Sequence, residues 1–192
     1  MTARAAPRVE EARKRAFLAL SPDADAQARI ASGVEELRRL VPEARFVRPE
    51  GIHLTLRFLG GVGEETLDLL SQDVARAAGE CPPFEARLKG PQLFPNRGRA
   101  RVLCLEMALP EPARSLQEAC EQASRRVGLA PEERPLRPHL TLARFLKPPR
   151  GLALPSRDFG TTRIDAVFLY ESHLRPGGSV YTPLRSFPLG AP

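Results

Sequence analysis

The fold is decided by two similar stretches of sequence, IHLTLRF at residues 52–58 and PHLTLARF at residues 138–145. Each holds a His-Leu-Thr-Leu core inside a short apolar run, which is typical of a β-strand rather than a helix. Successive side chains of a strand point to opposite faces, so each histidine shares a face with the threonine two positions later. The chain therefore contains the same His-x-Thr motif twice, and two of its three histidines occupy equivalent positions in the two copies.

The sequence around these stretches indicates an internal repeat. An apolar strand at residues 15–20 and a helix precede the first stretch, while a strand at residues 101–107 and a helix at residues 111–127 precede the second. We predict an α+β fold that is bilobal, a pseudo-two-fold repeat of two small, mainly antiparallel sheets with outer helices. The two His-Thr faces would then look at each other across a central cleft.

Turn and helix signals divide the rest of the chain. Ser21 is expected to cap the first helix, with Pro22 at its first helical position. A second helix is expected to open near Glu64. Further strands are expected at residues 84–88, at residues 163–170 and from residue 180, the first His-Thr strand is expected to close at Gly60-Gly61, and turn-forming residues predict a loop at 90–98.

From the composition we expect a cytoplasmic protein with reduced thiols and a single core. Its 192 residues, 42% of them hydrophobic, suffice for one core, and the three cysteines argue against a disulfide framework. We expect residues 1–13 to be a disordered or loosely attached extension and residues 14–192 to form a single bilobal domain. Nothing approaches the roughly 18–20 apolar residues of a membrane span, so no membrane association is expected. No feature demands more than a monomer.

Paired histidines suit acid–base chemistry on a phosphodiester. At neutral pH one imidazole acts as a base while its partner, biased towards imidazolium by an anion, acts as an acid. The neighbouring threonine hydroxyls and nearby arginines would hold phosphate oxygens, and the net charge of +6 suits an anionic partner. This scheme requires no metal. A zinc site is the competing chemistry, but neither strand places a third ligand at a suitable spacing.

Strand alternation separates the candidate arginines. Arg57 lies four residues after His53 and Arg137 lies two residues before His139, so straight strands would put both on the histidine faces as additional substrate contacts. Arg144 lies five residues after His139. It falls on the opposite face unless the strand bulges or ends first.

Several stretches together resemble a known family. They are RAFLAL (15–20), HLTLRFLG (53–60), RPHLTLAR (137–144), ESHL (171–174) and YTPL (181–184). The chain resembles the two-histidine (2H) phosphoesterases, specifically the LigT-like RNA 2′,3′-cyclic phosphodiesterases, also called 2′-5′ RNA ligases. The resemblance covers nearly everything after residue 14.

The resemblance implies a bilobal fold with both motifs lining a central cleft, and metal-free hydrolysis of a terminal RNA 2′,3′-cyclic phosphate to a 2′-phosphomonoester. His53 would be the proton donor to the departing 3′-oxygen and His139 the proton acceptor that activates water. Thr55, Thr141 and Arg144 would contact the phosphate, which for Arg144 implies a distortion at the end of its strand. Reverse 2′-5′ ligation would use the same groups without a nucleotide cofactor.

Two other functions stay open from the sequence. The same site could act on small cyclic nucleotides or on 2′-5′-linked oligonucleotides. Alternatively, the basic chain could be a noncatalytic RNA-binding module, in which case replacing His53 or His139 by alanine would barely alter RNA binding.

Overall fold

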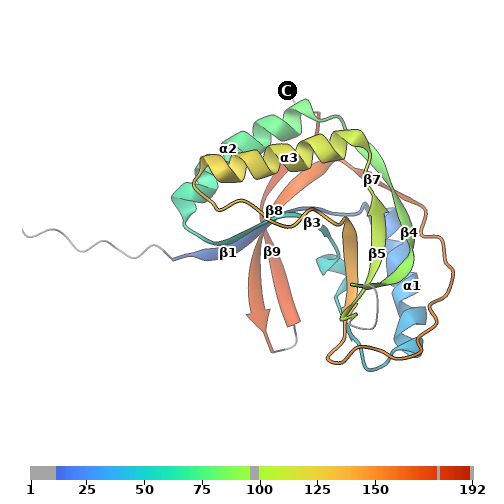
Figure 1. The fold of residues 1–192 in the computed structure, drawn as a ribbon. Coiled ribbons are helices and arrows are strands. Elements are labelled where there is room, and N and C mark those ends of the chain that lie inside the picture. The colour runs from blue at the N-terminus through green and yellow to red at the C-terminus, as the bar shows by residue number, and fades with distance from the viewer. Residues whose placement is uncertain (1–11, 96–99, 177, 191–192) are drawn as a thin grey trace, which may run out of the picture.

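The computed structural model of the chain describes residues 12–95, 100–176 and 178–190, which form two antiparallel sheets and three α-helices (Figure 1). Sheet A has the spatial order β3 (Leu54–Val62), β1 (Lys14–Leu20), β8 (Ala166–Arg175) and β9 (Gly178–Pro188). Sheet B has the order β2 (Arg45–Phe46), β6 (His139–Arg144), β5 (Val102–Ala108), β4 (Phe84–Phe94) and β7 (Thr161–Ile164). The helices are α1 (Ala24–Leu40), α2 (Glu64–Glu80) and α3 (Glu111–Arg126), and the 3-10 turn η1 is Pro49–Gly51.

The predicted repeat of strand, helix and His-Thr strand is confirmed. In sheet A, β1 pairs antiparallel with β3, and in sheet B, β5 pairs antiparallel with β6. Each sheet therefore holds one His-Thr strand next to the strand that begins its half of the repeat. The two His-Thr strands, β3 and β6, also contact each other where the sheets meet. The α+β architecture follows from this arrangement.

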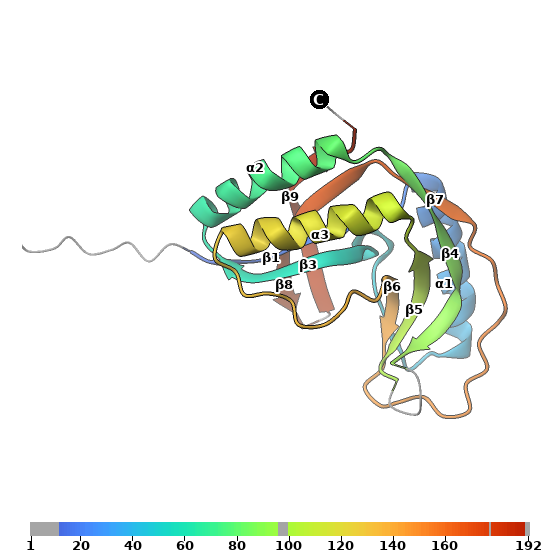
Figure 2. The same ribbon diagram turned by 45° about the horizontal axis from the view of Figure 1, so that its top comes forward.

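The helices of the two repeats pack on each other's sheets. Helix α3, which belongs to the second repeat, packs on α2 and on β3, so that α2 and α3 cover one face of sheet A (Figures 1 and 2). Helix α1, from the first repeat, lies beside sheet B and contacts β7 and η1. Each helix buries one apolar stripe at helical spacing, and these stripes join the sheets in one hydrophobic core.

Asp23 is the N-cap of α1, so the predictions that Ser21 caps this helix and that Pro22 is its first residue were wrong. The Asp23 carboxylate accepts hydrogen bonds from the backbone N–H of Ala26 at 2.8 Å and from that of Arg163 on β7 at 2.6 Å. Ser21 lies within 3.1 Å of the Tyr170 hydroxyl instead. A carboxylate accepts several bonds at once, which lets one side chain cap α1 and tie it to sheet B.

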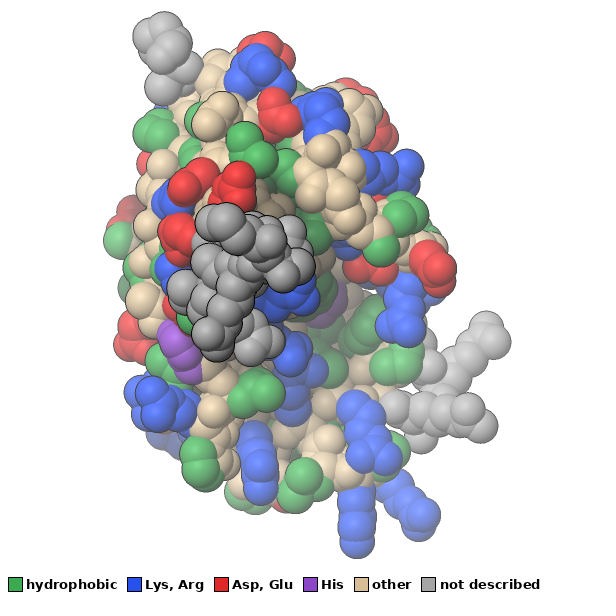
Figure 3. All heavy atoms as spheres, turned by 90° about the vertical axis from the view of Figure 1, so that its left-hand side faces the viewer, with side chains coloured by type: hydrophobic (Ala, Val, Ile, Leu, Met, Phe, Trp, Pro, Cys, Tyr) green, Lys and Arg blue, Asp and Glu red, His purple; other side chains and the backbone are tan. Residues whose placement is uncertain are grey.

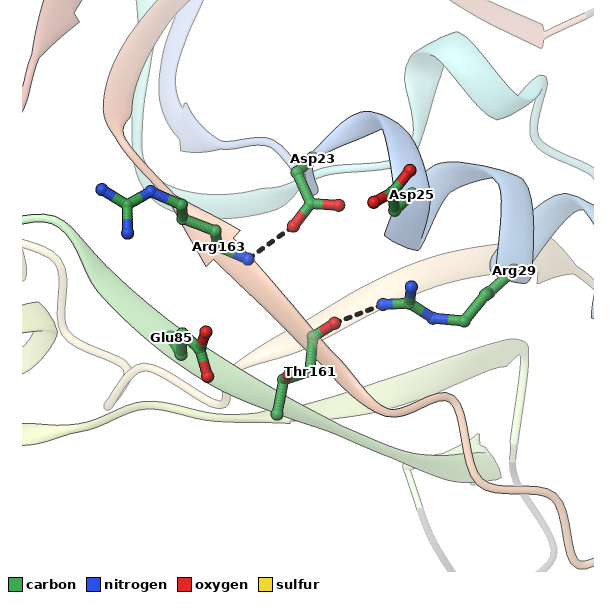
Figure 4. A pocket seen from close by; sticks show the side chains of 6 residues that line it. All are labelled: Asp23, Asp25, Arg29, Glu85, Thr161 and Arg163. Carbon is green, nitrogen blue, oxygen red and sulfur yellow. Dashed lines mark hydrogen bonds between the residues drawn. The ribbon is translucent and has the colours of Figure 1, made fainter.

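A polar pocket of about 330 Å³ lies at the same junction. In Figure 4, Arg29 reaches from α1 to the Thr161 carbonyl while Asp23 meets the backbone of Arg163. The pocket includes neither histidine of the repeated motif. Its lining consists of Asp23, Asp25, Arg29, Glu85, Thr161 and Arg163.

Three predicted strand boundaries were wrong. Strand β3 continues through Gly60-Gly61 to Val62, and β4 continues through Gly90 to Phe94, where a loop was expected. In β4 the pairing with β5 is shifted between Leu88 and Pro91, so a bulge absorbs the Gly-Pro pair without ending the strand.

The third error concerns residues 163–170, which were expected to form one strand. They belong to β7 and β8, which lie in different sheets on either side of Asp165. The sequence pattern does not show that the chain passes from sheet B to sheet A at Asp165, because strands in both sheets have the same period of two.

The structure describes only part of the predicted N-terminal extension and of the predicted loop at 90–98. Residues 1–11 of the expected extension and residues 96–99 of the expected loop lie outside the described residues. Strand β1 begins at Lys14, the first residue of the predicted domain, and the division into extension and domain stays a prediction. None of the helices in the described part of the chain has the length and apolar character needed to cross a membrane.

We predict that Gly33→Ala destabilises the protein. A Cβ at Gly33 would lie 2.5 Å from a ring carbon of Phe159, whose side chain is almost fully buried. The gain in helix propensity is about 1 kcal/mol, whereas overpacking costs about 1–3 kcal/mol, so the free energy of unfolding should fall. Urea denaturation measures the change.

The double variant Gly33→Ala/Phe159→Leu provides the control. Leucine removes the ring atoms that meet the new methyl group, so the double variant should lose less stability than the sum of the two single changes. Additive losses would show that the contact between α1 and Phe159 does not limit packing here.

Candidate active site

Each histidine of the repeated motif is held by the backbone two residues before it. The Nδ1 atom of His53 lies 2.8 Å from the carbonyl oxygen of Gly51, and that of His139 lies 2.7 Å from the carbonyl oxygen of Arg137. A carbonyl only accepts, so in both rings Nδ1–H donates. In the neutral imidazole the lone pair is then on Nε2, which is the atom available for proton transfer.

The threonines lie with their histidines as strand alternation predicts. His53 Nε2 lies 3.2 Å from Thr55 Oγ1, and because Nδ1 carries the ring proton, the hydroxyl donates to Nε2. In β6, His139 and Thr141 are half-buried while the intervening Leu140 is fully buried. Each motif thus places an imidazole and a hydroxyl on the same side of its sheet.

A bulge in β3 reverses the alternation after Thr55. The pairing with β1 skips Leu56, so that Leu56 and Arg57 are both buried and Phe58 is 58% exposed. A residue that the partner strand skips in this way reverses the alternation, so the side chains after it point to the opposite face of the sheet. The predicted placement of Arg57 on the face of His53 was therefore wrong.

Arg57 instead connects β3 to α3 and the chain that follows it. Its Nε lies 2.8 Å from a Glu121 carboxylate oxygen, its Nη1 lies 3.6 Å from Glu132, and its Nη2 donates to the carbonyl of Ala130. The side chain is only 6% exposed. The residues that Arg57 contacts, from Glu121 to Glu132, precede His139 in the chain. Arg57 therefore connects the strand of the first motif to the segment that leads to the second.

An equivalent bulge in β6 brings Arg144 to the histidine side. The pairing with β5 skips Leu142, so that Leu142 and Ala143 are both buried and Arg144 is exposed. This is the end-of-strand distortion that the family resemblance implied. Arg144 and Phe58 consequently take equivalent places, each five residues after a motif histidine.

Aromatic rings support both histidines. Phe17 stacks on His53 with ring centroids 4.7 Å apart, and Tyr181 meets His53 edge-on at 4.9 Å. On sheet B, Phe94 stacks on His139 at 5.2 Å, and the Arg137 guanidinium lies 5.7 Å from the Phe94 centroid. Arg137 and His139 thus contact the same ring, while the role of Arg137 as a substrate contact stays a prediction.

These supporting aromatic residues were not predicted from the sequence. The sequence predicts only a strand for the run that contains Phe17 and a loop for the residues around Phe94. The order of rings across a sheet depends on which strands pair, which alternation within one strand does not reveal.

The pKa of His53 depends on its burial and on side chains of the second motif. Burial lowers the pKa of His53 to about 4, the hydrogen bond to the Gly51 carbonyl opposes this shift, and the nearby His139 and Arg144 side chains add to it. Charges from the second motif thus act on the histidine of the first. At neutral pH His53 is an uncharged imidazole, and an anion placed between the motifs would raise its pKa.

The cysteines lie outside this chemistry. Cys81, Cys104 and Cys120 are free and buried. Burial raises the pKa of Cys104 to about 11 and that of Cys120 to about 12, so both stay thiols at neutral pH. Among the described residues no group of three or more His, Cys, Asp and Glu side chains could hold a metal ion.

The sequence matches a family model described as the 2′-5′ RNA ligase superfamily over residues 22–173. The chain belongs to this superfamily. The matched residues of this superfamily member include both His-Thr motifs and most of β8, whose Tyr170 ring stacks near His53 with centroids 6.1 Å apart.

Relatives in this superfamily carry a more specific name. A Methanothermobacter thermautotrophicus protein named RNA 2′,3′-cyclic phosphodiesterase is 34% identical over 183 residues, covering 91% of this chain and 98% of the relative. A Thermus thermophilus protein of the same name is 39% identical over 154 residues, covering 74% of each chain. These similarities extend well beyond the two motifs.

Solved structures show the same fold. A crystal structure of a Thermus thermophilus protein has a TM-score of 0.82 and 30% identity, covering 92% of this chain and 98% of that chain. Escherichia coli LigT complexed with 3′-AMP has a TM-score of 0.76 and 26% identity over the same shares of the two chains. The chain therefore shares its fold with these solved structures.

We predict that His53 titrates near pH 4 in the free protein and at a higher pH when inorganic phosphate is added. A bound anion stabilises the imidazolium, so the folded-state pKa should rise towards or above the ordinary value of about 6.5. Histidine NMR from pH 8 downwards measures both values. A free His53 that titrates near 6.5 would contradict the buried, positively charged site.

We further predict that Arg57 and Arg144 contribute differently to stability. Arg57→Met leaves Glu121 facing β3 without its buried partner and should lower the free energy of unfolding by about 3 kcal/mol. Arg144→Met removes an exposed side chain and should change it by less than about 0.5 kcal/mol. Urea denaturation of both variants makes the comparison, and equal losses would contradict the assignment of Arg57 as structural.

Proposed function

We propose that this protein hydrolyses the terminal 2′,3′-cyclic phosphate of RNA to a 2′-phosphomonoester. One observation carries the proposal: two imidazoles, each fixed through Nδ1 to a backbone carbonyl, lie at β3 and β6, which contact each other. Relatives that align over most of the chain are named RNA 2′,3′-cyclic phosphodiesterase. Acid–base catalysis on a phosphodiester is the chemistry that such a pair suits.

The proposed reaction is an in-line displacement at phosphorus. Nε2 of His139 accepts a proton from water as its oxygen attacks, and the bond between phosphorus and the 3′-oxygen breaks. Nε2–H of His53 donates a proton to that oxygen, which leaves as the 3′-hydroxyl. Thr55, Thr141 and Arg144 hold the phosphate oxygens while negative charge redistributes over them.

The charge of the substrate sets the protonation state of the proposed acid. In the free protein His53 is neutral because burial and the second motif's positive charge lower its pKa. A cyclic phosphodiester carries a negative charge, so its binding between His53 and Arg144 favours the imidazolium. The Gly51 carbonyl also favours that form, because it accepts the Nδ1–H bond throughout. Substrate binding would thereby prepare the proton donor.

We extend the proposal to the partner and the setting. The substrate is RNA with a 2′,3′-cyclic phosphate end, and reverse 2′-5′ ligation would run the same proton transfers backwards with a 5′-hydroxyl in place of water. In Figure 3, Lys and Arg side chains predominate over the lower part of the face shown, which suits a polyanion. We propose a monomer that works in the cytoplasm without a metal or other cofactor.

The direct test uses a short RNA that ends in a 2′,3′-cyclic phosphate, incubated in chelator with the wild type, His53→Ala and His139→Ala. The wild type should form only the 2′-phosphate, and each variant should lose about 10²- to 10⁴-fold in rate, the contribution typical of a general acid or base. His173→Ala provides the matched control and should retain full activity. Chromatography that separates 2′-phosphate from 3′-phosphate ends gives the readout.

Other results would redirect the assignment. Formation of the 3′-phosphate would reverse the leaving group, and loss of activity in chelator would require a metal. Turnover of small cyclic nucleotides or 2′-5′-linked oligonucleotides alone would keep the site and change the substrate. RNA binding without turnover, unchanged in both histidine variants, would favour a noncatalytic RNA-binding module.

A further inference from the structure

The edge of sheet B beside the second motif carries an arginine that the proposed reaction does not use. Strand β2 is the outermost strand of this sheet and pairs antiparallel with β6. In this pairing Arg45 lies opposite Arg144, and Phe46 lies opposite Ala143. Residues directly opposite each other on neighbouring strands share a face, with Cβ atoms about 4.5–5.5 Å apart. Arg45 therefore lies beside Arg144, one strand further out.

The neighbours of Phe46 identify the face on which Arg45 lies. The Phe46 ring packs against the hydrophobic core, and the guanidinium of Arg38 on α1 lies 4.7 Å from its centroid. Phe46 thus points to the side of sheet B where α1 lies. Successive side chains of a strand point to opposite faces, so Arg45 points away from α1. Arg45 and Arg144 consequently share the face that carries His139.

These two neighbouring arginines have no carboxylate partner. Both Arg45 and Arg144 are exposed, and neither forms an ion pair within residues 12–95, 100–176 and 178–190. By contrast, the exposed Arg87 and Arg125 each bind a carboxylate. Like charges directly opposite each other on a sheet repel and lower stability. Anionic groups bound at this pair would remove the repulsion, and a guanidinium presents a planar fork of N–H donors that matches a phosphate.

We propose that Arg45 binds the phosphodiester on the 5′ side of the terminal nucleotide, the group that joins this nucleotide to the rest of the RNA. The inference rests on the proposed function, because it takes Arg144 to hold the cyclic phosphate. The charged groups of RNA are its phosphates, and the diester on the 5′-oxygen of the same ribose is the nearest one to the cyclic end. Because β2 is an edge strand, the RNA chain can leave the site past Arg45.

The subsite would make the enzyme prefer the end of a chain to a free nucleoside cyclic phosphate. The 5′ phosphodiester lies away from the reacting bonds, so its contact with Arg45 is made equally before and during the reaction. Such a contact lowers KM and leaves kcat unchanged. Arg45 would then determine specificity, while His53 and His139 carry out the proton transfers.

The test compares two substrates that share the base and the reacting group. The first is adenosine 2′,3′-cyclic phosphate with a free 5′-hydroxyl, and the second carries a methyl phosphodiester on its 5′-oxygen. The wild type should show a kcat/KM about 10-fold higher for the second, the gain expected from one charge-assisted hydrogen bond at an exposed site. Arg45→Gln should abolish this preference through KM and leave kcat/KM for the first substrate unchanged.

A matched variant and a salt series separate this contact from general electrostatics. Arg38→Gln removes the same charge from the neighbourhood of β2 on the other face of the sheet, so it should retain the full preference. The preference of the wild type should fall as salt is added, because an exposed ionic contact is screened, whereas Arg45→Gln should show no such dependence. Thermal unfolding establishes that each variant is folded.

The outcomes are distinct from those that test the proposed function. If the wild type turns over neither small substrate nor a cyclic-ended RNA, the proposed function fails and the subsite fails with it. If the wild type turns over both small substrates equally well, the subsite is overturned while the function stands. The subsite is also overturned if Arg45→Gln loses equally on both substrates, or if Arg38→Gln abolishes the preference as fully as Arg45→Gln.

Discussion

The hydrogen bond from each motif histidine to the carbonyl two residues before it is the constraint on which the site depends. In both halves of the molecule this bond fixes the ring orientation and leaves Nε2 as the reactive atom. The residues that supply the carbonyls, Gly51 and Arg137, lie outside the strands, just before β3 and β6. A histidine inside a regular strand would find its neighbouring carbonyls engaged in the sheet, so the position at the strand's beginning matters.

The two motif histidines have different surroundings, although their motifs are the same. His53 is packed between Phe17 and Tyr181 in sheet A, and burial is the largest cause of its lowered pKa. His139 stacks on Phe94, and an arginine lies close by. Two copies of one motif thus acquire different environments from their neighbours, which suits a pair whose members take opposite roles as acid and base.

The exchange of helices explains how two separate sheets keep this geometry. Because α1 packs beside sheet B and α3 on sheet A, neither repeat can bury its own helix without the other. The contacts that hold this exchange are specific: Asp23 joins α1 to β7, Gly33 admits the ring of Phe159, and Arg57 joins β3 to α3. The relative position of β3 and β6 therefore depends on the packing of the whole core.

The sequence by itself determined the repeat, the two His-Thr strands, the three helices and the shared face of each histidine and threonine. These features follow from periodicity within one segment, which needs no knowledge of neighbours. The tertiary structure decided the bulges at Leu56 and Leu142, the switch between sheets at Asp165 and the surroundings of Arg57 and Phe58. A bulge is defined by the register with the neighbouring strand, which the sequence of one segment does not contain. Likewise, the burial and the pKa of a side chain depend on the residues that pack around it.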